Sequence, residues 1–172
     1  MAISRTIVVA GAGIGGLTAA LALAARGFRV IVMERAERLE EAGAGLQLSP
    51  NASRILIELG LEPLLARRAI TPESISIMTA RTGKEIGRIP LGEAATFRYG
   101  APYWIIHRAD LQAALVTKVK SHPDIDLRLG AQYEDVAVYP KGVTVVQRSG
   151  VDRVQEPVLA LIGADGVWSS AR

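Results

Sequence analysis

Cysteine is absent from the 172 residues of this chain, and histidine occurs only twice. Without cysteine, disulfides and thiolate metal sites are excluded, and the reducing cytoplasm is the expected location. The two histidines, His107 and His122, stand far apart and have no partnering cluster of acidic residues. The sequence therefore predicts no metal site.

Blocks of positive charge and uninterrupted membrane-length helices are also missing. The formal net charge is only +3 and the arginines are scattered, so we expect no nucleic-acid partner. Ile7–Ala25 carries no charge and resembles a signal peptide or membrane span, but its glycines weaken a membrane helix. Hydrophobic residues make up 49% of a chain of single-domain length, which suffices for a proper core.

Three glycines with G-x-G-x-x-G spacing follow the apolar run Ile7–Ala10. Gly11 permits a tight turn out of a strand, Gly13 permits close approach of a pyrophosphate, and Gly16 permits close packing of a helix on the strand. A second apolar run then ends at Glu34, which can accept hydrogen bonds from a ribose diol. The segment predicts a βαβ unit that binds an adenine dinucleotide.

The rest of the chain mixes helical and extended patterns. Residues 35–48 are rich in glycine and charge and are expected to form a mobile loop. Ser49 and Pro50 begin a helix that Gly60 ends, with Ile55, Leu56 and Leu59 on its apolar face. Residues 73–90 predict a strand–turn–strand, and Arg108–Lys120 predicts an amphipathic helix. Further strands are expected over Ile125–Leu129, Tyr133–Val138, Val143–Gln147 and Val154–Ile162.

The last expected strand has a near-continuous apolar run, Leu159–Ile162, which is typical of a strand buried on both faces. Gly163–Gly166 follows as a turn, with a helix expected to begin behind it. A buried parallel strand needs a covering helix. We therefore expect the chain to be the N-terminal piece of a longer protein or a shortened gene product.

Three further elements are candidate ligand contacts, each with a structural alternative. Gln47, within the glycine-containing segment Gly43–Asn51, could bind a ring edge or a ribityl hydroxyl, or the segment could be an ordinary flexible connection. Arg108, at a helix start, suits an anionic ligand, or could be a solvated arginine beside Asp110. Asp165, at a strand end, could face a ligand crevice, or could cap a helix or close an Asx-turn.

Taken together, the glycine loop, Gly43–Asn51, His107–Leu111 and Ala160–Arg172 resemble the single-component FAD-dependent aromatic hydroxylases, in particular salicylate hydroxylase and the related hydroxybenzoate and hydroxynicotinate monooxygenases. The resemblance implies an α/β fold: a Rossmann-like FAD-binding domain with three layers and a mostly parallel sheet, a β-hairpin insertion and part of a β-rich substrate domain. Residues 1–172 would form an incomplete FAD-binding region, in which residues 73–106 are an insertion on the substrate-binding side.

The resemblance also implies roles for individual residues. The FAD pyrophosphate would be held by Gly11, Gly13, Ile14 and Gly16. Glu34 would bind the adenosine ribose and Arg35 would lie over the adenine side. Leu46, through its backbone, and Gln47 would face the flavin, and Arg108 would reach the ribityl-pyrophosphate. Asp165 belongs to a motif associated with FAD and with the reaction of NAD(P)H, and Arg172 closes that motif. No catalytic residue is identified.

Members of this family reduce FAD with NADH or NADPH and hydroxylate a small aromatic acid with O2, through a flavin C4a-hydroperoxide. The family chains are considerably longer, and a second FAD motif and the residues that activate the phenol lie beyond residue 172. We therefore expect weak FAD binding and no turnover by this chain alone. The alternatives are an NAD-dependent dehydrogenase, which the strand–turn–strand at 73–90 disfavours, and a dinucleotide-binding module without chemistry.

Overall fold

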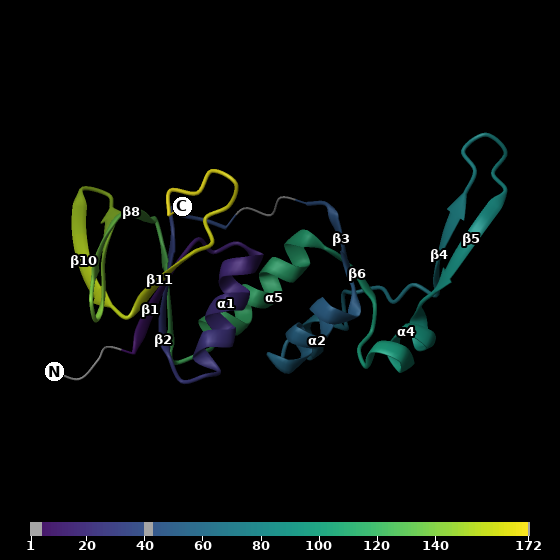
Figure 1. The fold of residues 1–172 in the computed structure, drawn as a ribbon, viewed down its shortest axis with the longest axis horizontal. Helices are drawn as coiled ribbons and strands as arrows, with labels where there is room; N and C mark the ends of the chain where they lie inside the picture. The colour runs from purple at the N-terminus through teal and green to yellow at the C-terminus, as the bar shows by residue number, and fades with distance from the viewer. Residues whose placement is uncertain (1–4, 40–42, 172) are drawn as a thin grey trace. The chain divides into compact units, whose positions relative to one another are not determined.

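A computed structural model describes residues 5–39 and 43–171 of the chain (Figure 1). The chain divides into two compact units, one formed by Met1–Glu41 with Leu115–Arg172 and the other by Ala42–Ala114. Each unit has its own sheets. None of the helices in the described ranges is long and apolar enough to cross a membrane.

A four-stranded parallel sheet forms the centre of the first unit. Its strand order is β11 (Ala160–Gly163), β1 (Thr6–Ala10), β2 (Arg29–Glu34) and β7 (Ile125–Leu129). Helix α1 (Ile14–Ala24) connects β1 to β2, which confirms the predicted βαβ unit. Its buried side chains include Leu17 and Leu21, which form an apolar face on the helix.

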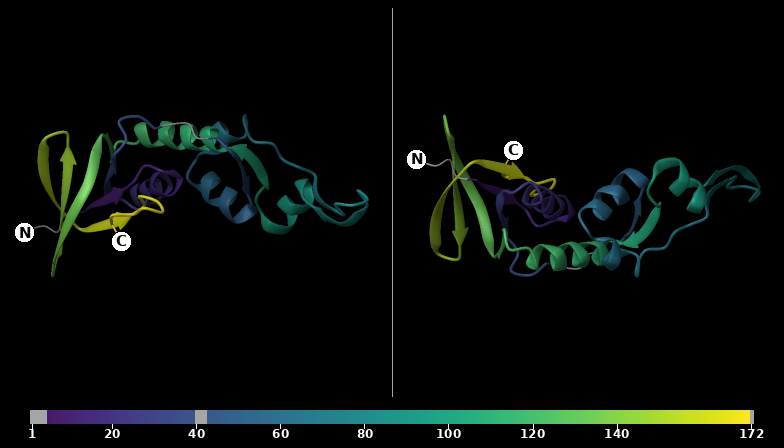
Figure 2. Two further views of the ribbon diagram at one scale, coloured as in Figure 1. Left: turned by 90° about the horizontal axis from the view of Figure 1, so that it is seen from above. Right: turned by 90° about the horizontal axis from the view of Figure 1, so that it is seen from below.

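An antiparallel sheet covers the other face of the parallel sheet. It consists of β8 (Ala131–Tyr139), β9 (Gly142–Ser149) and β10 (Asp152–Val158). Val8, Ile31 and Met33 pack with Val145 and Val158 in one buried cluster. Because side chains alternate along a strand, the intervening residues of β1 and β2 face helix α1. Helix, parallel sheet and antiparallel sheet form three layers, as Figures 1 and 2 show for this unit.

The second unit contains two antiparallel strand pairs and short helices. Strand β3 (Gly45–Leu48) pairs with β6 (Trp104–His107), and β4 (Ser74–Met78) pairs with β5 (Glu85–Pro90) as the predicted hairpin. The helices are α2 (Pro50–Glu58), α3 (Glu62–Leu65) and α4 (Gly92–Tyr99). Helix α5 (Arg108–Lys120) begins here and ends in the first unit, with bounds equal to the predicted ones.

Five expectations are corrected. The segment 35–48 is not a loop throughout, because Gly45–Leu48 forms β3; residues 40–42 lie outside the described part. Val154–Ile162 is not one strand, because it divides between β10 and β11, which belong to different sheets. Leu159–Ile162 is only partly buried, since β11 pairs on one side alone, and residues 167–171 form turns rather than a helix. Ile55 is half-exposed, whereas Leu56 beside it is buried.

Candidate cofactor site

A cavity of about 220 Å³ lies in the first unit where β1, β2 and β11 end. The carboxyl ends of parallel strands share one edge of a sheet, and ligands of α/β folds bind in the crevice there. Five residues predicted for the site line this cavity: Gly11, Gly13, Glu34, Arg35 and Asp165. The volume is below that of a pocket enclosing a whole drug-sized ligand, so the cavity encloses only part of a dinucleotide.

The glycines of the loop have two separate functions in the structure. Gly11 has a φ of +103°, and a Cβ there would lie 2.4 Å from the carbonyl oxygen of Ala164; a Cβ on Gly16 would lie 1.9 Å from the carbonyl oxygen of Gly11. Both positions therefore exclude a side chain because the backbones themselves pack together. By contrast, a Cβ on Gly13 would have no atom within 4 Å. The space beside Gly13 is open for a ligand.

Helix α1 begins beside this open space, and Ile14 is its first residue. Gly13 is the N-cap and supplies no side-chain hydrogen bond to the first turn. Helix N-termini present N–H groups and the positive end of the helix dipole, which together attract phosphates. A pyrophosphate fits this combination of an open glycine and an N-terminus without a side-chain cap, so the residues present suit the diphosphate of FAD.

Glu34 ends β2 and anchors the glycine loop. Its Oε2 accepts a hydrogen bond of 2.9 Å from the Ala12 N–H, and its Oε1 accepts one of 3.0 Å from the Ala36 N–H. A carboxylate has about four lone-pair positions, so two remain for hydroxyl donors of a ribose. The sequence predicts only a ribose contact for Glu34, and the structure adds a role in holding the glycine loop in place.

Asp165 organises the turn behind β11. Its carboxylate accepts hydrogen bonds from the Ser169 hydroxyl at 2.6 Å and from the N–H groups of Ser170 and Ala171 at 2.7 and 3.2 Å. Partial burial raises the pKa of Asp165, but these hydrogen bonds outweigh it and hold the pKa below its ordinary value. This is the turn-closing role that the sequence left open, and the same residue also lines the cavity. Arg172 lies outside the described residues.

The sequence did not reveal the part of the cavity that comes from β8 and from the last turn. Gln132 and Tyr133 on β8, and the exposed Trp168, complete the lining. Burial, followed by the nearby carboxylates of Asp135 and Asp165, raises the pKa of Tyr133. No motif marks these residues, because β8 reaches the cavity only by packing against the face of β2. An aromatic residue near a strand start is too weak a signal to identify them.

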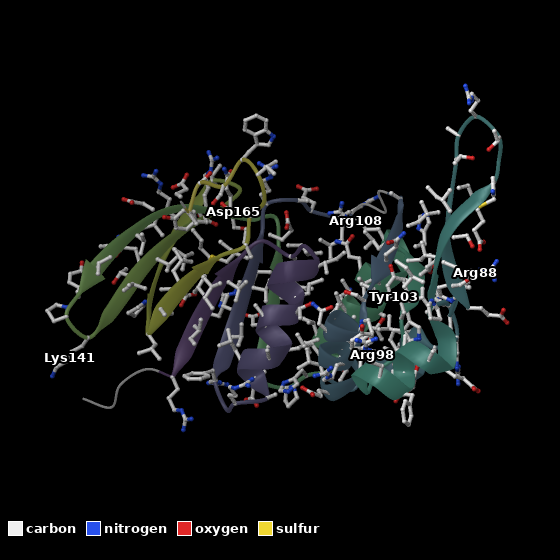
Figure 3. The ribbon with its side chains drawn as sticks, turned by 45° about the vertical axis from the view of Figure 1, so that its right-hand side comes forward. Arg88, Arg98, Tyr103, Arg108, Lys141 and Asp165 are labelled. Atoms are coloured by element: carbon white, nitrogen blue, oxygen red, sulfur yellow. The ribbon has the colours of Figure 1, made fainter. Side chains whose placement is uncertain are left out.

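Leu46, Gln47 and Arg108 belong to the second unit. The pairing of β3 with β6 brings their segments together, since Gly45 is opposite His107 and the Arg108 N–H donates to the Ala44 carbonyl at 2.9 Å. The Tyr103 hydroxyl donates to Gln47 Oε1 at 2.8 Å. Figure 3 labels Tyr103 and Arg108 on this part of the chain.

Arg108 is exposed, and the structure shows no ion pair between it and Asp110. Asp110 instead forms an ion pair with Arg68. The exposure of Arg108 agrees with a solvated side chain and equally leaves the guanidinium accessible to an anionic ligand. Within the described ranges, no group of three or more histidine, aspartate or glutamate side chains could hold a metal ion.

The glycine loop, the acid at the end of β2 and the cavity at the carboxyl ends of the strands define a dinucleotide-binding α/β fold. A family model described as "FAD binding domain" matches residues 4–172. The chain belongs to this FAD-binding domain family, which identifies FAD as its cofactor. The resemblance inferred from the motifs is thereby confirmed.

Similar proteins agree with this assignment. The chain is 39% identical over 98% of its length to a 3-hydroxybenzoate 6-hydroxylase of Aquipseudomonas alcaligenes, covering 42% of that protein. It is 35% identical over its full length to a 6-hydroxynicotinate 3-monooxygenase of Pseudomonas fluorescens, covering 43%. A solved tetrameric 2-methyl-3-hydroxypyridine-5-carboxylic acid oxygenase matches 99% of the chain with a TM-score of 0.79 and 29% identity, over 42% of that structure. The chain thus spans about two fifths of the length of these relatives.

Gly13 and Gly16 can be used to separate ligand binding from folding. We expect Gly13→Val to leave the free energy of unfolding within about 1 kcal/mol of the parent while abolishing FAD binding, because the side chain occupies ligand space. Gly16→Ala should lower the free energy of unfolding by at least about 1–3 kcal/mol, because its Cβ overlaps backbone. Urea denaturation and flavin-fluorescence titration measure the two effects. Stoichiometric FAD on the Gly13→Val chain would contradict the assignment.

Glu34→Ala should lower both the stability of the glycine loop and the affinity for FAD. Losing two hydrogen bonds to backbone N–H groups is expected to lower the free energy of unfolding by about 1–3 kcal/mol, and FAD affinity should fall as well. Glu37→Ala removes the same charge three residues further on and serves as the control. An unchanged FAD affinity in Glu34→Ala would remove Glu34 from the site.

Asp165 should contribute to stability in a pH-dependent way. A carboxylate whose pKa is lowered by folding stabilises the fold above its unfolded pKa of about 3.9 and loses this contribution as the pH falls through its folded pKa. We therefore expect Asp165→Asn to be less stable than the parent at neutral pH, and the two urea midpoints to converge below about pH 4. Asp152→Asn, an exposed acid on β10, is the control. A difference that stays constant with pH would refute this role.

Proposed function

We propose that the chain is the FAD-binding part of an NAD(P)H-dependent monooxygenase, located in the cytoplasm, that uses O2 to hydroxylate a small, salicylate-like aromatic acid. The observation that carries the proposal is the cavity beside Gly13, which is open to a ligand exactly where helix α1 presents its N-terminus. The relatives named above, a hydroxybenzoate hydroxylase and a hydroxynicotinate monooxygenase, support the aromatic-acid substrate class.

In this proposal the residues of the first unit bind the adenosine diphosphate half of FAD. Gly11, Gly13 and Gly16 with Ile14 form the loop and helix start that receive the pyrophosphate. The lone pairs of the Glu34 carboxylate that Ala12 and Ala36 leave unused accept the ribose hydroxyls, and the guanidinium of Arg35 covers the adenine side of the cavity. Asp165 keeps the turn after β11 in a fixed conformation against the cavity.

The residues of the second unit would bind the flavin half. Leu46 offers backbone groups and Gln47 a side-chain amide, which Tyr103 holds in place. Arg108 offers a guanidinium to the ribityl-pyrophosphate. When bound, FAD supplies the redox chemistry by taking a hydride from NADH or NADPH and reacting with O2.

Ligand binding and nucleotide oxidation test the proposal. We expect the chain to bind FAD with quenching of flavin fluorescence and to lose this binding in Gly13→Val. We expect the whole monooxygenase, but not this chain alone, to consume NADH or NADPH faster when salicylate or 3-hydroxybenzoate is present. Binding of NAD without binding of FAD would contradict the proposal in favour of a dehydrogenase. FAD binding by the whole protein without any stimulation of NAD(P)H oxidation by the aromatic acids would favour a cofactor-binding module.

A further inference from the structure

A second cavity, of about 620 Å³, lies wholly within the second unit. Its walls come from the start of α2, from α4 and from the base of the β4–β5 hairpin, so most of them belong to residues 73–106. Apolar side chains dominate the lining: Ile75, Ile89, Pro90, Leu91, Ala94 and Ala95. This volume is within the range of pockets that enclose small molecules, and a mostly apolar wall suits an aromatic ring.

The only charged residues in the lining of this cavity are Arg54 and Arg98. Arg54 is already engaged, because its guanidinium donates to the Tyr99 carbonyl at 2.7 Å. The guanidinium of Arg98 lies over the Tyr99 ring, 5.5 Å from its centre, and has no acidic partner within residues 5–39 and 43–171. A cation beside an apolar wall, without a neighbouring carboxylate, is complementary to an organic anion.

Tyr103 connects this cavity to the proposed flavin contacts. It lines the cavity, and its hydroxyl donates to Gln47 Oε1. Figure 3 labels Arg98 and Tyr103 on this side of the chain. A ligand in the cavity would therefore lie against the residue that holds Gln47, the side chain that the proposed function places toward the flavin.

We propose that this cavity binds the aromatic acid, with Arg98 pairing with the carboxylate and the apolar wall packing against the ring. The proposal rests on the proposed function, because the substrate class and the role of Gln47 come from it. A guanidinium and a carboxylate form two parallel hydrogen bonds, so Arg98 would select aromatic carboxylates over uncharged phenols of the same size. Arg98 is thus assigned a role in substrate specificity.

Salicylate is itself fluorescent and serves as the probe in a titration of the chain. We expect saturable binding to the parent and at least about tenfold weaker binding to Arg98→Leu. Arg98→Lys should have an intermediate affinity, because it keeps the positive charge but cannot form the two parallel hydrogen bonds of a guanidinium. Arg81→Leu, in the hairpin turn away from the cavity, is the matched control and should bind like the parent. Phenol should compete at least about tenfold more weakly than benzoate, since it lacks the carboxylate.

Flavin fluorescence in the same samples separates this inference from the proposed function. Normal FAD binding together with no saturable salicylate binding would overturn the role of the cavity and leave FAD binding intact. Equal salicylate affinities for Arg98→Leu and Arg81→Leu, or equal competition by phenol and benzoate, would also overturn it. Loss of FAD binding in the parent would instead refute the proposed function.

Discussion

The fold depends on the close approach of three backbone segments at the carboxyl end of β1. The Gly11 N–H donates to the Met33 carbonyl at 2.7 Å, and the Ala164 N–H donates to the Ala10 carbonyl at 2.7 Å. Gly16 then sits against the Gly11 carbonyl at a separation that leaves no room for a Cβ. These contacts join β2, β11 and α1 around one turn, so the positions of the ligand-facing groups follow from packing that needs no ligand.

Much of the fold could be predicted because its elements are specified by nearby residues. Helix α5 matched its predicted bounds, since Leu111, Leu115 and Val119 repeat with helical spacing and are buried. Strand β3 escaped prediction because it is short, begins with glycine, and forms only through its distant partner β6. The division of residues 154–162 between two sheets likewise depends on which strands pair with each half, which a local pattern does not contain.

In the candidate site, too, residues within one short segment could be predicted, whereas residues brought in by distant strands could not. Gly11, Gly13 and Glu34 could be assigned because a short βαβ unit fixes their spacing. Gln132 and Tyr133 could not, because they reach the cavity through the packing of an antiparallel sheet more than ninety residues further along the chain. The turn-closing role of Asp165 was one of the alternatives predicted from the sequence, but the hydrogen bonds from backbone N–H groups to Glu34 were not predicted. Both acids fix backbone geometry before any ligand arrives.

Ion pairing distinguishes structural arginines from those suited to bind anions. Arg128 pairs with Asp126 and Glu156, and its pKa reflects burial, which lowers it, outweighed by these two acids, which raise it. Two carboxylates already balance the charge of this guanidinium, so it is poorly suited to attract an anionic ligand. In the described part of the chain, neither Arg98 nor Arg108 forms an ion pair; Asp110, the acid next to Arg108 in the sequence, pairs with Arg68. The pairing of the other arginines with acids therefore decides which guanidinium groups can bind a carboxylate or a diphosphate.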